Sequence, residues 1–322
     1  MKSFIIEKND AGQRLDKYLT KSFPNLPQTL MYKYIRLKRI KVNGKRAEIS
    51  ARLSVGDKVE LYINDEFFEK SETRYDFMGA AKKLDLLYED EHILLLNKKV
   101  GLLCHPDDRE FVDTLISRVK RYLYEKGEFH PDDAQSFTPA LVNRIDRNTC
   151  GIVIAAKTAE ALRVLNQKMK DREIHKFYLC VVHGTPQPPE GLLEGYLVKD
   201  EKKNKVFISK CKTDPQAKEI RTRYKVLKSE NGLSLLEVEL LTGRTHQIRA
   251  HLASIGHPLL GDGKYGKNEQ NKKSGLKKQC LCSYRLQFDF TTDAGALAYL
   301  NGKSFEIADV WFRTEFETLA SV

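Results

Sequence analysis

The sequence contains few of the features that mark metal centres, secretion or membrane insertion. Its six cysteines include no C-x-x-C pair, so zinc ribbons and dithiol redox motifs have no support. No apolar run approaches the roughly 20 residues that a membrane helix needs. The first residues lack the apolar segment and the small-residue cleavage site of a secretion signal. These absences predict a cytoplasmic protein with reduced thiols and without a membrane partner.

Positive charge is abundant, and it is concentrated near the start of the chain. The 322 residues carry 55 Lys and Arg against 44 Asp and Glu, a net charge of +11. Residues 1–62 hold 14 basic and 6 acidic side chains, whereas residues 63–110 hold 7 basic and 12 acidic ones. Charge that served only solubility would not be sorted in this way, and such a basic piece is typical of a module that binds a polyanion. Nucleic acid is therefore the predicted partner.

The basic piece has the pattern of a small folded unit. Leu15 and Leu19 predict a first short amphipathic helix, and residues 29–37 predict a second. Alternating residues 40–42 then lead into Asn43-Gly44, a strong hairpin signal. The second helix and the hairpin carry seven basic residues and no acid: Lys33, Arg36, Lys38, Arg39, Lys41, Lys45 and Arg46.

This pattern, R-L-D-K-Y-L followed by Y-I-R-L-K-R-I-K-V-N-G-K, resembles the small RNA-binding domain first known from a ribosomal small-subunit protein, also called the alpha-L motif. The resemblance covers residues 12–63 and implies that the seven cations contact RNA phosphates. We expect an α/β RNA-binding domain over residues 1–63, an acidic, polar linker over residues 64–83, and a larger second domain over residues 84–322.

The larger part of the chain has many strand-like runs and few helices. Residues 93–96 and 152–156 are short apolar runs that predict buried strands, and residues 236–240 alternate like a half-buried one. Residues 113–126 predict a helix capped by Asp113. This composition indicates an α+β protein dominated by antiparallel sheet. A monomer is the default expectation.

Two sequence patterns resemble a cofactor motif and a metal site, but the residues around them do not fit either one. Residues 261–266 match the dinucleotide fingerprint G-x-G-x-x-G, but no βαβ unit surrounds them. His246, His251 and His257 lack the i, i+4 spacing of a zinc site and have no Glu or Cys companion. The sequence therefore predicts no cofactor and no metal. The failed dinucleotide match also weakens the hypothesis of an RNA methyltransferase, which would use a methyl donor, without excluding it.

The stretch Val142–Lys157 contains a carboxylate in an unusual setting. Asp146 lies in a polar turn between Arg144 and Arg147, shortly before an apolar run. In isolation such a turn is more often a solvated loop than a site. A carboxylate that pairs with an arginine in a desolvated cleft stays charged, however, and a carboxylate nucleophile attacks sugars well.

Two further residues in distant segments support a site. Tyr178 and Arg244 lie at strand edges, and Arg244 is expected at the start of a helix with Ile248 and Leu252 on its inner face. A tyrosine beside the carboxylate can stack on a base or relay a proton. Together with the basic module, these residues favour chemistry on a nucleoside within RNA.

These segments resemble the RluA-type pseudouridine synthases, which isomerise uridine in ribosomal or transfer RNA. Residues 143–151 match the family's H-R-L-D-x-x-T-S-G, residues 176–178 its Lys-x-Tyr strand, and residues 243–249 its G-R-[ST]-H-Q-[IL]-R. The resemblance covers about residues 84–315. It implies the family's mainly antiparallel mixed-sheet fold and a reaction without redox change or group donor, which requires no cofactor or metal.

The resemblance also assigns roles to single residues. It implies that Asp146 is the catalytic aspartate, with Arg244 as its partner, Tyr178 as the active-site tyrosine, and Arg144 helping to hold the base out of the RNA helix. Further substrate-binding residues expected from the same motifs are Lys176, Thr245, His246, Gln247 and Arg249. Large-subunit (23S) ribosomal RNA is the expected substrate, with transfer RNA second. Whether Asp146 forms a covalent adduct or promotes a glycal intermediate stays open.

The match departs from the family at four places. Asn143 stands for His, Ile145 for Leu and Cys150 for Ser, and Lys98-Lys99 replaces the usual Lys-Pro. None of these changes removes a catalytic residue, so they are expected to affect which RNA site is read. A non-catalytic RNA-binding or ribosome-assembly factor on the same fold is the alternative from another class, and the intact motifs disfavour it.

Overall fold

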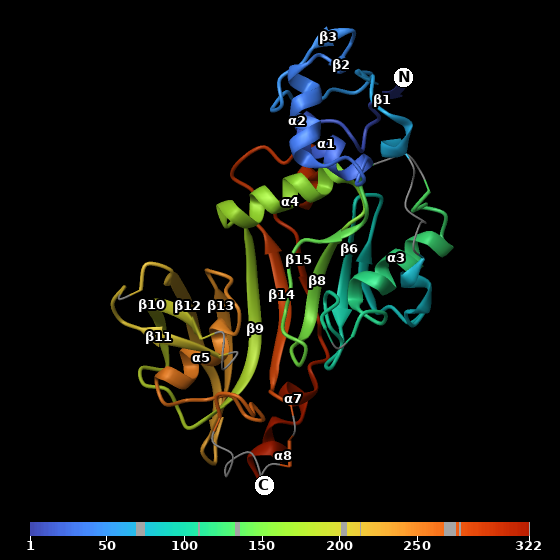
Figure 1. Ribbon diagram of the computed structural model, residues 1–322. Coiled ribbons are helices and arrows are strands. Elements are labelled where there is room, and N and C mark those ends of the chain that lie inside the picture. The colour runs from blue at the N-terminus through green and yellow to red at the C-terminus, as the bar shows by residue number, and fades with distance from the viewer. Residues whose placement is uncertain are drawn as a thin grey trace.

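The computed structural model describes residues 1–68, 75–108, 110–132, 136–200, 205–212, 214–266, 275–276 and 278–321. Two sheets organise these residues, a four-stranded one near the N-terminus and an eleven-stranded one that contains the later strands (Figure 1). None of the helices in these ranges is both long and apolar enough to cross a membrane.

The N-terminal unit is a small sheet with two helices packed on it. It comprises β1 (Lys2–Ile5), α1 (Leu15–Ser22), α2 (Gln28–Arg36), β2 (Ile40–Val42), β3 (Lys45–Arg46) and β4 (Lys58–Leu61), with strand order β1-β4-β2-β3. Asn43 and Gly44 join β2 to β3 with φ of +53° and +72°, the left-handed pair that a two-residue hairpin turn requires. The two predicted helices and the hairpin are confirmed.

The seven predicted RNA-contacting cations gather on α2, on the hairpin and on the segment between them. All are exposed except Lys41, which is half-buried. Arg39 and Lys41 lie over the rings of Tyr34 and Tyr62, 5.6 and 5.1 Å from the ring centroids. None of the seven forms an ion pair with a residue that the structure describes, so their charge is available to a ligand. Their contact with RNA stays a prediction.

The large sheet is antiparallel over most of its width. Its strands are β5 (Leu86–Glu89), β6 (Ile93–Lys98), β7 (Ala140–Leu141), β8 (Cys150–Ala156), β9 (Ile174–His183), β10 (Glu190–Asp200), β11 (Lys205–Ser209), β12 (Lys218–Glu230), β13 (Leu233–Leu240), β14 (Leu281–Phe288) and β15 (Ser304–Glu306). The main order is β11-β10-β12-β13-β9-β14-β8-β6-β5, with β15 beside β14 and β7 beside β8. Among the strand pairs of the described residues only β8–β14 is parallel. The predicted α+β fold with a mainly antiparallel mixed sheet is confirmed.

Helices cover the sheet and close its ends. They are α3 (Leu115–Glu125), α4 (Ala159–Asp171), α5 (Gln247–Ser254), α7 (Trp311–Thr314) and α8 (Phe316–Ala320), with 3-10 turns at Asp65–Phe68, Asp76–Gly79 and Gly295–Leu300. Figure 1 shows α4 lying across one end of the large sheet, directly beneath the N-terminal unit. Helix α3 packs beside β6, and α5 lies near the strands β10 to β13 (Figure 1).

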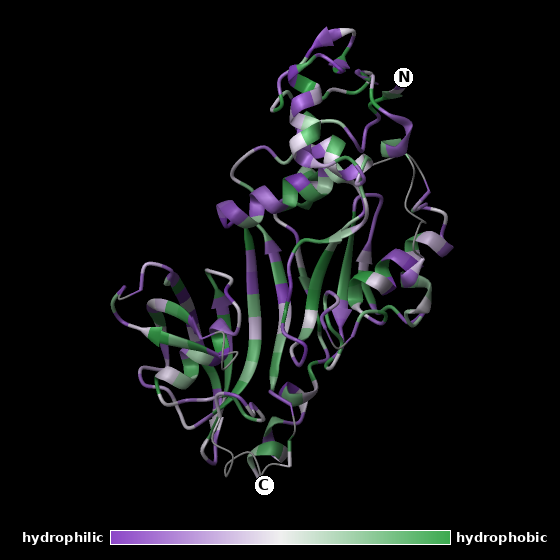
Figure 2. Ribbon diagram, in the orientation of Figure 1, coloured by the Kyte–Doolittle hydropathy of each residue, from purple (hydrophilic) through white to green (hydrophobic). Residues whose placement is uncertain are grey.

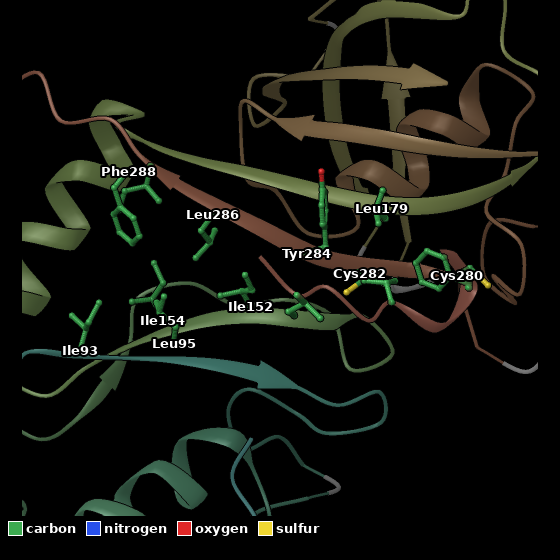
Figure 3. Close-up of a cluster of buried hydrophobic side chains, with 14 of the residues drawn as sticks. Ile93, Leu95, Ile152, Ile154, Leu179, Cys280, Cys282, Tyr284, Leu286 and Phe288 are labelled. Atoms are coloured by element: carbon green, nitrogen blue, oxygen red, sulfur yellow. The ribbon is translucent and has the colours of Figure 1, made fainter. Parts of the chain in front are cut away.

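The centre of the large sheet is buried on both faces. Ile152 and Ile154 of β8 pack with Leu179 of β9 in one cluster (Figure 3). The alternate residues Val153 and Tyr178 pack on the opposite face, in the cluster that α3 covers. Strand β8 is accordingly hydrophobic along most of its length (Figure 2), and the buried strand predicted over residues 152–156 is confirmed.

The start of α3 differs from the prediction. The N-cap residue is Thr114, whose hydroxyl oxygen accepts a hydrogen bond from the Ser117 amide at 3.3 Å. Asp113 lies outside the helix, where it pairs with the Arg118 guanidinium at 2.7 Å. The prediction of Asp113 as the cap was wrong because a carboxylate that finds an arginine one turn along can stabilise the same end of the helix from one residue further out.

The predicted linker, 64–83, is anchored at both ends. Phe68 packs against Phe4 and Phe23 of the N-terminal unit. Phe77 packs against Tyr124 of α3. Residues 69–74 between them lie outside the described residues. The division into domains at 63 and 84 stays a prediction.

Candidate active site

A cavity of about 570 Å³ opens where the loop before β8, the start of β9 and the loop before α5 meet. Asp146 lies in the first of these loops, and its carbonyl oxygen accepts a hydrogen bond from the Thr149 amide at 3.0 Å, which closes the turn. Gly151 follows with a φ of +114°, and its backbone lies so close to β14 that a Cβ would be 2.2 Å from the Ser283 carbonyl oxygen. Only glycine fits there, and this contact fixes where the aspartate loop leaves the sheet.

The arginine that pairs with Asp146 is Arg249, so the expected pairing with Arg244 is wrong. Arg249 Nη1 lies 2.8 Å from Asp146 Oδ2. Helix α5 begins only at Gln247, because His246 has a left-handed φ of +55° that separates Arg244 from the helix. Arg249, in the first turn of α5, is therefore buried beneath the cavity, while Arg244 is exposed and lines the cavity from outside the helix.

The Arg249 guanidinium also binds a second carboxylate, that of Asp262. Arg249 Nε and Nη2 donate to the two oxygens of Asp262 at 2.7 and 2.9 Å, and Asp262 is completely buried. Burial alone would lower the pKa of Arg249, but hydrogen bonds and charge from Asp262 and then from Asp146 raise it above its ordinary value. Burial alone would raise the pKa of Asp262, but Arg249 holds it below its usual range. A permanently charged, immobile cation thus orients the Asp146 carboxylate.

Tyr178 contributes a phenol to the floor of the cavity. It lies on β9 directly opposite Ser283 of β14 in the strand register, and its side chain is 5% exposed. Burial raises the pKa of Tyr178, the Ser283 hydroxyl opposes this rise, and the negative charge of Asp146 adds to it. The hydroxyl therefore keeps its proton at neutral pH, and it lines the same cavity as the aspartate.

The loop before α5 is held by two of the predicted site residues. Gln247 is buried, and its amide bonds the Thr242 hydroxyl at 3.0 Å, the Arg244 amide at 3.1 Å and the Arg221 carbonyl at 3.1 Å. His246 Nδ1 is 3.0 Å from the Tyr265 hydroxyl, and its Nε2 is 3.9 Å from Asp146 Oδ2. Burial lowers the pKa of His246 to about 4, although Asp146 opposes this, so the ring is neutral at pH 7. Both residues support the loop; their contact with substrate stays a prediction.

Basic residues surround the cavity opening. Arg144, Arg244 and Thr245 line the cavity and are exposed. Lys176 is half-buried, with its ammonium 3.6 Å from the Met169 sulfur, and burial followed by the charge of Arg172 lowers its pKa. A cavity with one fixed carboxylate, one protonated phenol and a cationic opening can accept a nucleotide, a polar ring with an anionic backbone.

Family comparisons agree with this arrangement. The model of the RNA pseudouridylate synthase family matches residues 92–254, and that of the S4 domain matches residues 13–59. The chain belongs to the RNA pseudouridylate synthase family. It is an RNA pseudouridine synthase with an N-terminal S4 domain, and the three motifs of the synthase supply Asp146, Tyr178 and Arg249 to one cavity.

Curated relatives cover most of the synthase. An uncharacterized RNA pseudouridine synthase of Mycoplasma genitalium is 32% identical over 293 residues, 88% of this chain and 88% of the relative. The ribosomal large subunit pseudouridine synthase C of Vibrio parahaemolyticus is 30% identical over 264 residues, 81% of this chain and 79% of the relative. Among solved structures, human RNA pseudouridylate synthase domain containing 4 has a TM-score of 0.57 at 21% identity, covering 74% of this chain and 93% of that one. This last likeness concerns the fold alone.

Two residues of the synthase site were not predicted from the sequence. Asp262 belongs to a stretch, residues 256–262, that extends the third motif of the family, but nothing local marks it as the partner of Arg249. Lys98 is fully buried, and its ammonium donates to the carbonyl oxygens of Leu102 at 2.8 Å and of Lys99 and Arg147 at 3.1 Å. It therefore ties the loop after β6 to the residue next to Asp146. Its only sequence signal was its place in the Lys-Lys pair.

The departures from the family motif have local explanations. The Asn143 side chain lines the cavity, but its Oδ1 accepts a hydrogen bond from the Ile154 amide at 2.8 Å, so it extends the backbone pairing of β8. Ile145 is buried in the cluster on the α3 side of the sheet. The Cys150 thiol lies 3.6 Å from the Leu281 carbonyl oxygen. In the described part of the chain, no group of three or more His, Cys, Asp or Glu side chains could hold a metal ion.

Proposed function

We propose that the synthase converts uridine to pseudouridine in large-subunit ribosomal RNA. Two observations favour this substrate over others. The catalytic cavity opens among cations on a chain that also carries an S4 domain with seven cations that form no ion pair with a described residue, as a large folded RNA requires. The relative from Vibrio parahaemolyticus, which aligns over 81% of the chain, is named for the large ribosomal subunit.

The observation that carries the proposal is the Asp146–Arg249 pair beneath the cavity. A uridine inside a helix is out of reach of a half-buried carboxylate in the wall of a cavity, so the nucleotide has to be turned out of the stack into the cavity. Arg249 binds Asp146 Oδ2, and no described residue hydrogen-bonds Oδ1. The carboxylate acts at the ribose C1′, where the developing oxocarbenium-like charge makes an oriented anion effective. The bond between C1′ and uracil N1 then breaks.

Isomerisation requires the freed uracil to turn and bond again through carbon 5. In the product a C1′–C5 bond replaces the C1′–N1 bond, the proton of C5 leaves and N1 gains one. Tyr178 contacts the ring and carries both proton transfers: its phenol donates its proton to N1, and the phenolate so formed, a strong base because burial raises the pKa of Tyr178, takes the C5 proton. Arg144 fills the space that the base leaves in the RNA. Lys176, Arg244 and Thr245 bind the neighbouring phosphates.

The test uses three RNA pools from cells that lack the protein: large-subunit RNA, small-subunit RNA and transfer RNA. Each is labelled with tritium at uridine C5 and incubated with the pure protein, and release of tritium to water reports loss of the C5 proton. We expect release from large-subunit RNA, at one or a few uridines that sequencing after carbodiimide treatment locates. Release from transfer RNA alone would replace the proposed substrate, and release from none would overturn the activity.

Asp146→Asn provides the mechanistic arm of this test. The amide keeps the size of the side chain but neither acts as a nucleophile nor stabilises positive charge at C1′, so we expect tritium release to disappear while RNA binding stays within about twofold of the unmodified protein. The matched control is Asp171→Asn, an exposed residue of α4 outside the cavity lining, which should release tritium at the normal rate. Full activity of Asp146→Asn would contradict the mechanism.

A further inference from the structure

One helix touches both the S4 domain and the catalytic cavity. The first two turns of α4 contact the N-terminal unit: Arg163 Nη1 donates to the Ala11 carbonyl oxygen at 2.7 Å, and Asn9 Oδ1 accepts from the Ala159 amide at 3.4 Å. Gly12 lies against the same guanidinium with a φ of +76°, and a Cβ there would be 3.1 Å from the Arg163 Cζ. In Figure 1 the N-terminal unit rests on this end of α4.

A second contact strengthens the junction from the side of the catalytic domain. The Ser136 amide donates to Asp10 Oδ1 at 2.7 Å, and Gln13 Nε2 donates to the Ser136 hydroxyl at 2.6 Å. Asp10 is 2% exposed. The segment from Asn9 to Gln13 is therefore bonded to two separate parts of the catalytic domain, which restricts rotation as well as separation of the two units.

The other end of α4 belongs to the active site. Met169, Lys170 and Arg172 line the cavity together with Asp146 and Tyr178. This end is fixed to the sheet by Lys168, whose buried ammonium lies 2.6 Å from Glu173 Oε2 and 2.6 Å from the Thr292 carbonyl oxygen, and 4.9 Å from the centroid of the Phe290 ring. Helix α4 is thus held at both ends.

We propose that α4 is a rigid spacer that sets the distance between the RNA held by the S4 domain and the uridine in the cavity, with Arg163 as its positioning residue. The inference rests on the proposed function and goes beyond it, since it states how one uridine is selected. Arg163 touches neither the cavity nor the seven cations of the S4 domain. It acts on specificity only through the contact with Ala11.

The length of α4 gives this spacer a scale. Thirteen residues at about 1.5 Å each span about 20 Å. The β2–β3 hairpin lies at the end of the N-terminal unit away from α4 (Figure 1), so the N-terminal unit as well as α4 stands between the cations of the hairpin and the cavity. At roughly 3.4 Å per stacked nucleotide, 20 Å corresponds to about six nucleotides. An RNA hairpin with fewer base pairs than this therefore reaches the cavity but not the S4 cations.

The experiment compares two substrates and three variants of the full chain. The substrates are full-length large-subunit RNA and a short stem-loop excised around the mapped uridine, with too few base pairs to reach the S4 domain. The variants are Arg163→Glu, the double variant Asn9→Ala/Arg163→Ala, which adds no repulsive charge, and the control Gln167→Ala. Gln167 lies on the exposed side of α4 and bonds only Asp171 among the described residues. Small-angle X-ray scattering reports the separation of the two units.

We expect the two junction variants to show an increased radius of gyration and an unchanged kcat/KM on the stem-loop. On full-length RNA their kcat/KM should fall about tenfold, because the tethered domain still binds RNA but no longer holds the uridine in place. Pseudouridine should also appear at additional uridines near the original one. Gln167→Ala should match the unmodified protein in all three measurements.

Three results would overturn the inference. Equal loss on both RNAs would mean that Arg163 only stabilises the catalytic fold. Unchanged rate and site choice on full-length RNA would mean that the junction does not select the uridine. Loss on full-length RNA without expansion would mean that Arg163 contacts RNA directly. If the unmodified protein forms no pseudouridine in any RNA, the proposed function itself fails and the spacer role falls with it, and this result is distinguishable from the other three.

Discussion

Asp146 and Arg249 are 103 residues apart in the chain, and their side chains meet at 2.8 Å in the wall of the candidate active-site cavity. The Arg249 guanidinium also binds the fully buried carboxylate of Asp262, which fixes its orientation toward Asp146. At this distance a pair of unit charges in a partly desolvated site interacts by about 4 kcal/mol or more. The position of the Asp146 carboxylate therefore depends on an ion-pair triad whose other two members are buried, and not on its own loop alone.

The first prediction contrasts the two arginines of the third motif. Arg249→Ala leaves Asp262 buried without its cation, so we expect the free energy of unfolding to fall by about 3–5 kcal/mol and activity to be lost. Arg244→Ala removes only an exposed side chain at the cavity opening, so its stability should be unchanged and its KM for RNA should rise. Urea unfolding and tritium-release kinetics measure both effects. If Arg244→Ala lost stability and Arg249→Ala did not, the assignment of the aspartate's partner would be reversed.

Lys98 offers a second prediction with a matched neighbour. Lys98→Met keeps the length of the side chain but removes a buried donor: the Leu102 carbonyl oxygen loses its one partner among the described residues, and the Arg147 oxygen, next to Asp146, keeps only the Gly101 amide at 2.8 Å. We expect a loss of about 1–3 kcal/mol in the free energy of unfolding, and a fall of about tenfold or more in kcat as Asp146 shifts. The control is Lys99→Met, because that ammonium is exposed and pairs with Asp85 at the surface. Equal behaviour of the two variants would argue against a positioning role for Lys98.

The sequence allowed prediction of features that depend on short stretches of chain. The Asn43-Gly44 hairpin, the buried strand at residues 152–156 and the grouping of Asp146 with Tyr178 all follow from local patterns or from motifs. The partner of Asp146 could not be predicted in this way, because it depends on where α5 begins. The left-handed φ of His246 delays the helix to Gln247 and turns residue 249 inward, and a non-glycine residue in that conformation leaves no mark in the sequence. Asp262 and Lys98 were missed because their partners come from distant segments or from backbone carbonyls.

The variant Tyr178→Phe distinguishes the role of the Tyr178 hydroxyl from that of its ring. The ring packs in the cluster on the cavity side of the sheet, and the phenylalanine keeps that packing, so we expect the free energy of unfolding to change by less than about 1 kcal/mol. Without the hydroxyl the C5 proton has no relay, and kcat should fall by about 10²–10⁴-fold while the affinity for RNA is retained. Single-turnover rates on the mapped RNA measure the chemical step directly. A loss confined to RNA affinity would instead indicate that Tyr178 serves only to stack on the base.

The burial of His251 predicts that the free energy of unfolding falls at acid pH. His251 is 2% exposed, bonded through Nδ1 to the Thr222 hydroxyl at 3.0 Å, and burial lowers its pKa from 6.5 to about 4. Between pH 4 and 6.5 the unfolded chain binds the proton and the folded chain does not, so the free energy of unfolding falls as the pH is lowered through this range. The loss from His251 is at most about 3 kcal/mol. His251→Gln should reduce the difference in urea midpoint between pH 7 and pH 5. The control His130→Gln, at an exposed position, should leave this difference unchanged. If the difference persisted in His251→Gln, the acid sensitivity would belong to other groups.

The salt dependence of RNA binding tests the seven cations of the S4 domain. Each phosphate that a cation neutralises contributes about 0.7–0.9 to the slope of log Kd against log salt concentration. The triple variant Lys38→Ala/Lys45→Ala/Arg46→Ala removes three exposed charges that pair with no described residue, so we expect the slope to decrease by about 2–3. The control Lys82→Ala/Lys303→Ala/Arg313→Ala lowers the net charge equally, but those cations lie outside the S4 domain and contact Glu125, the Tyr299 ring and Glu306. Its slope should stay unchanged, because only cations that contact phosphate release counterions. If both triple variants lowered the slope equally, RNA binding would follow the overall charge of the protein and not the surface formed by α2 and the hairpin.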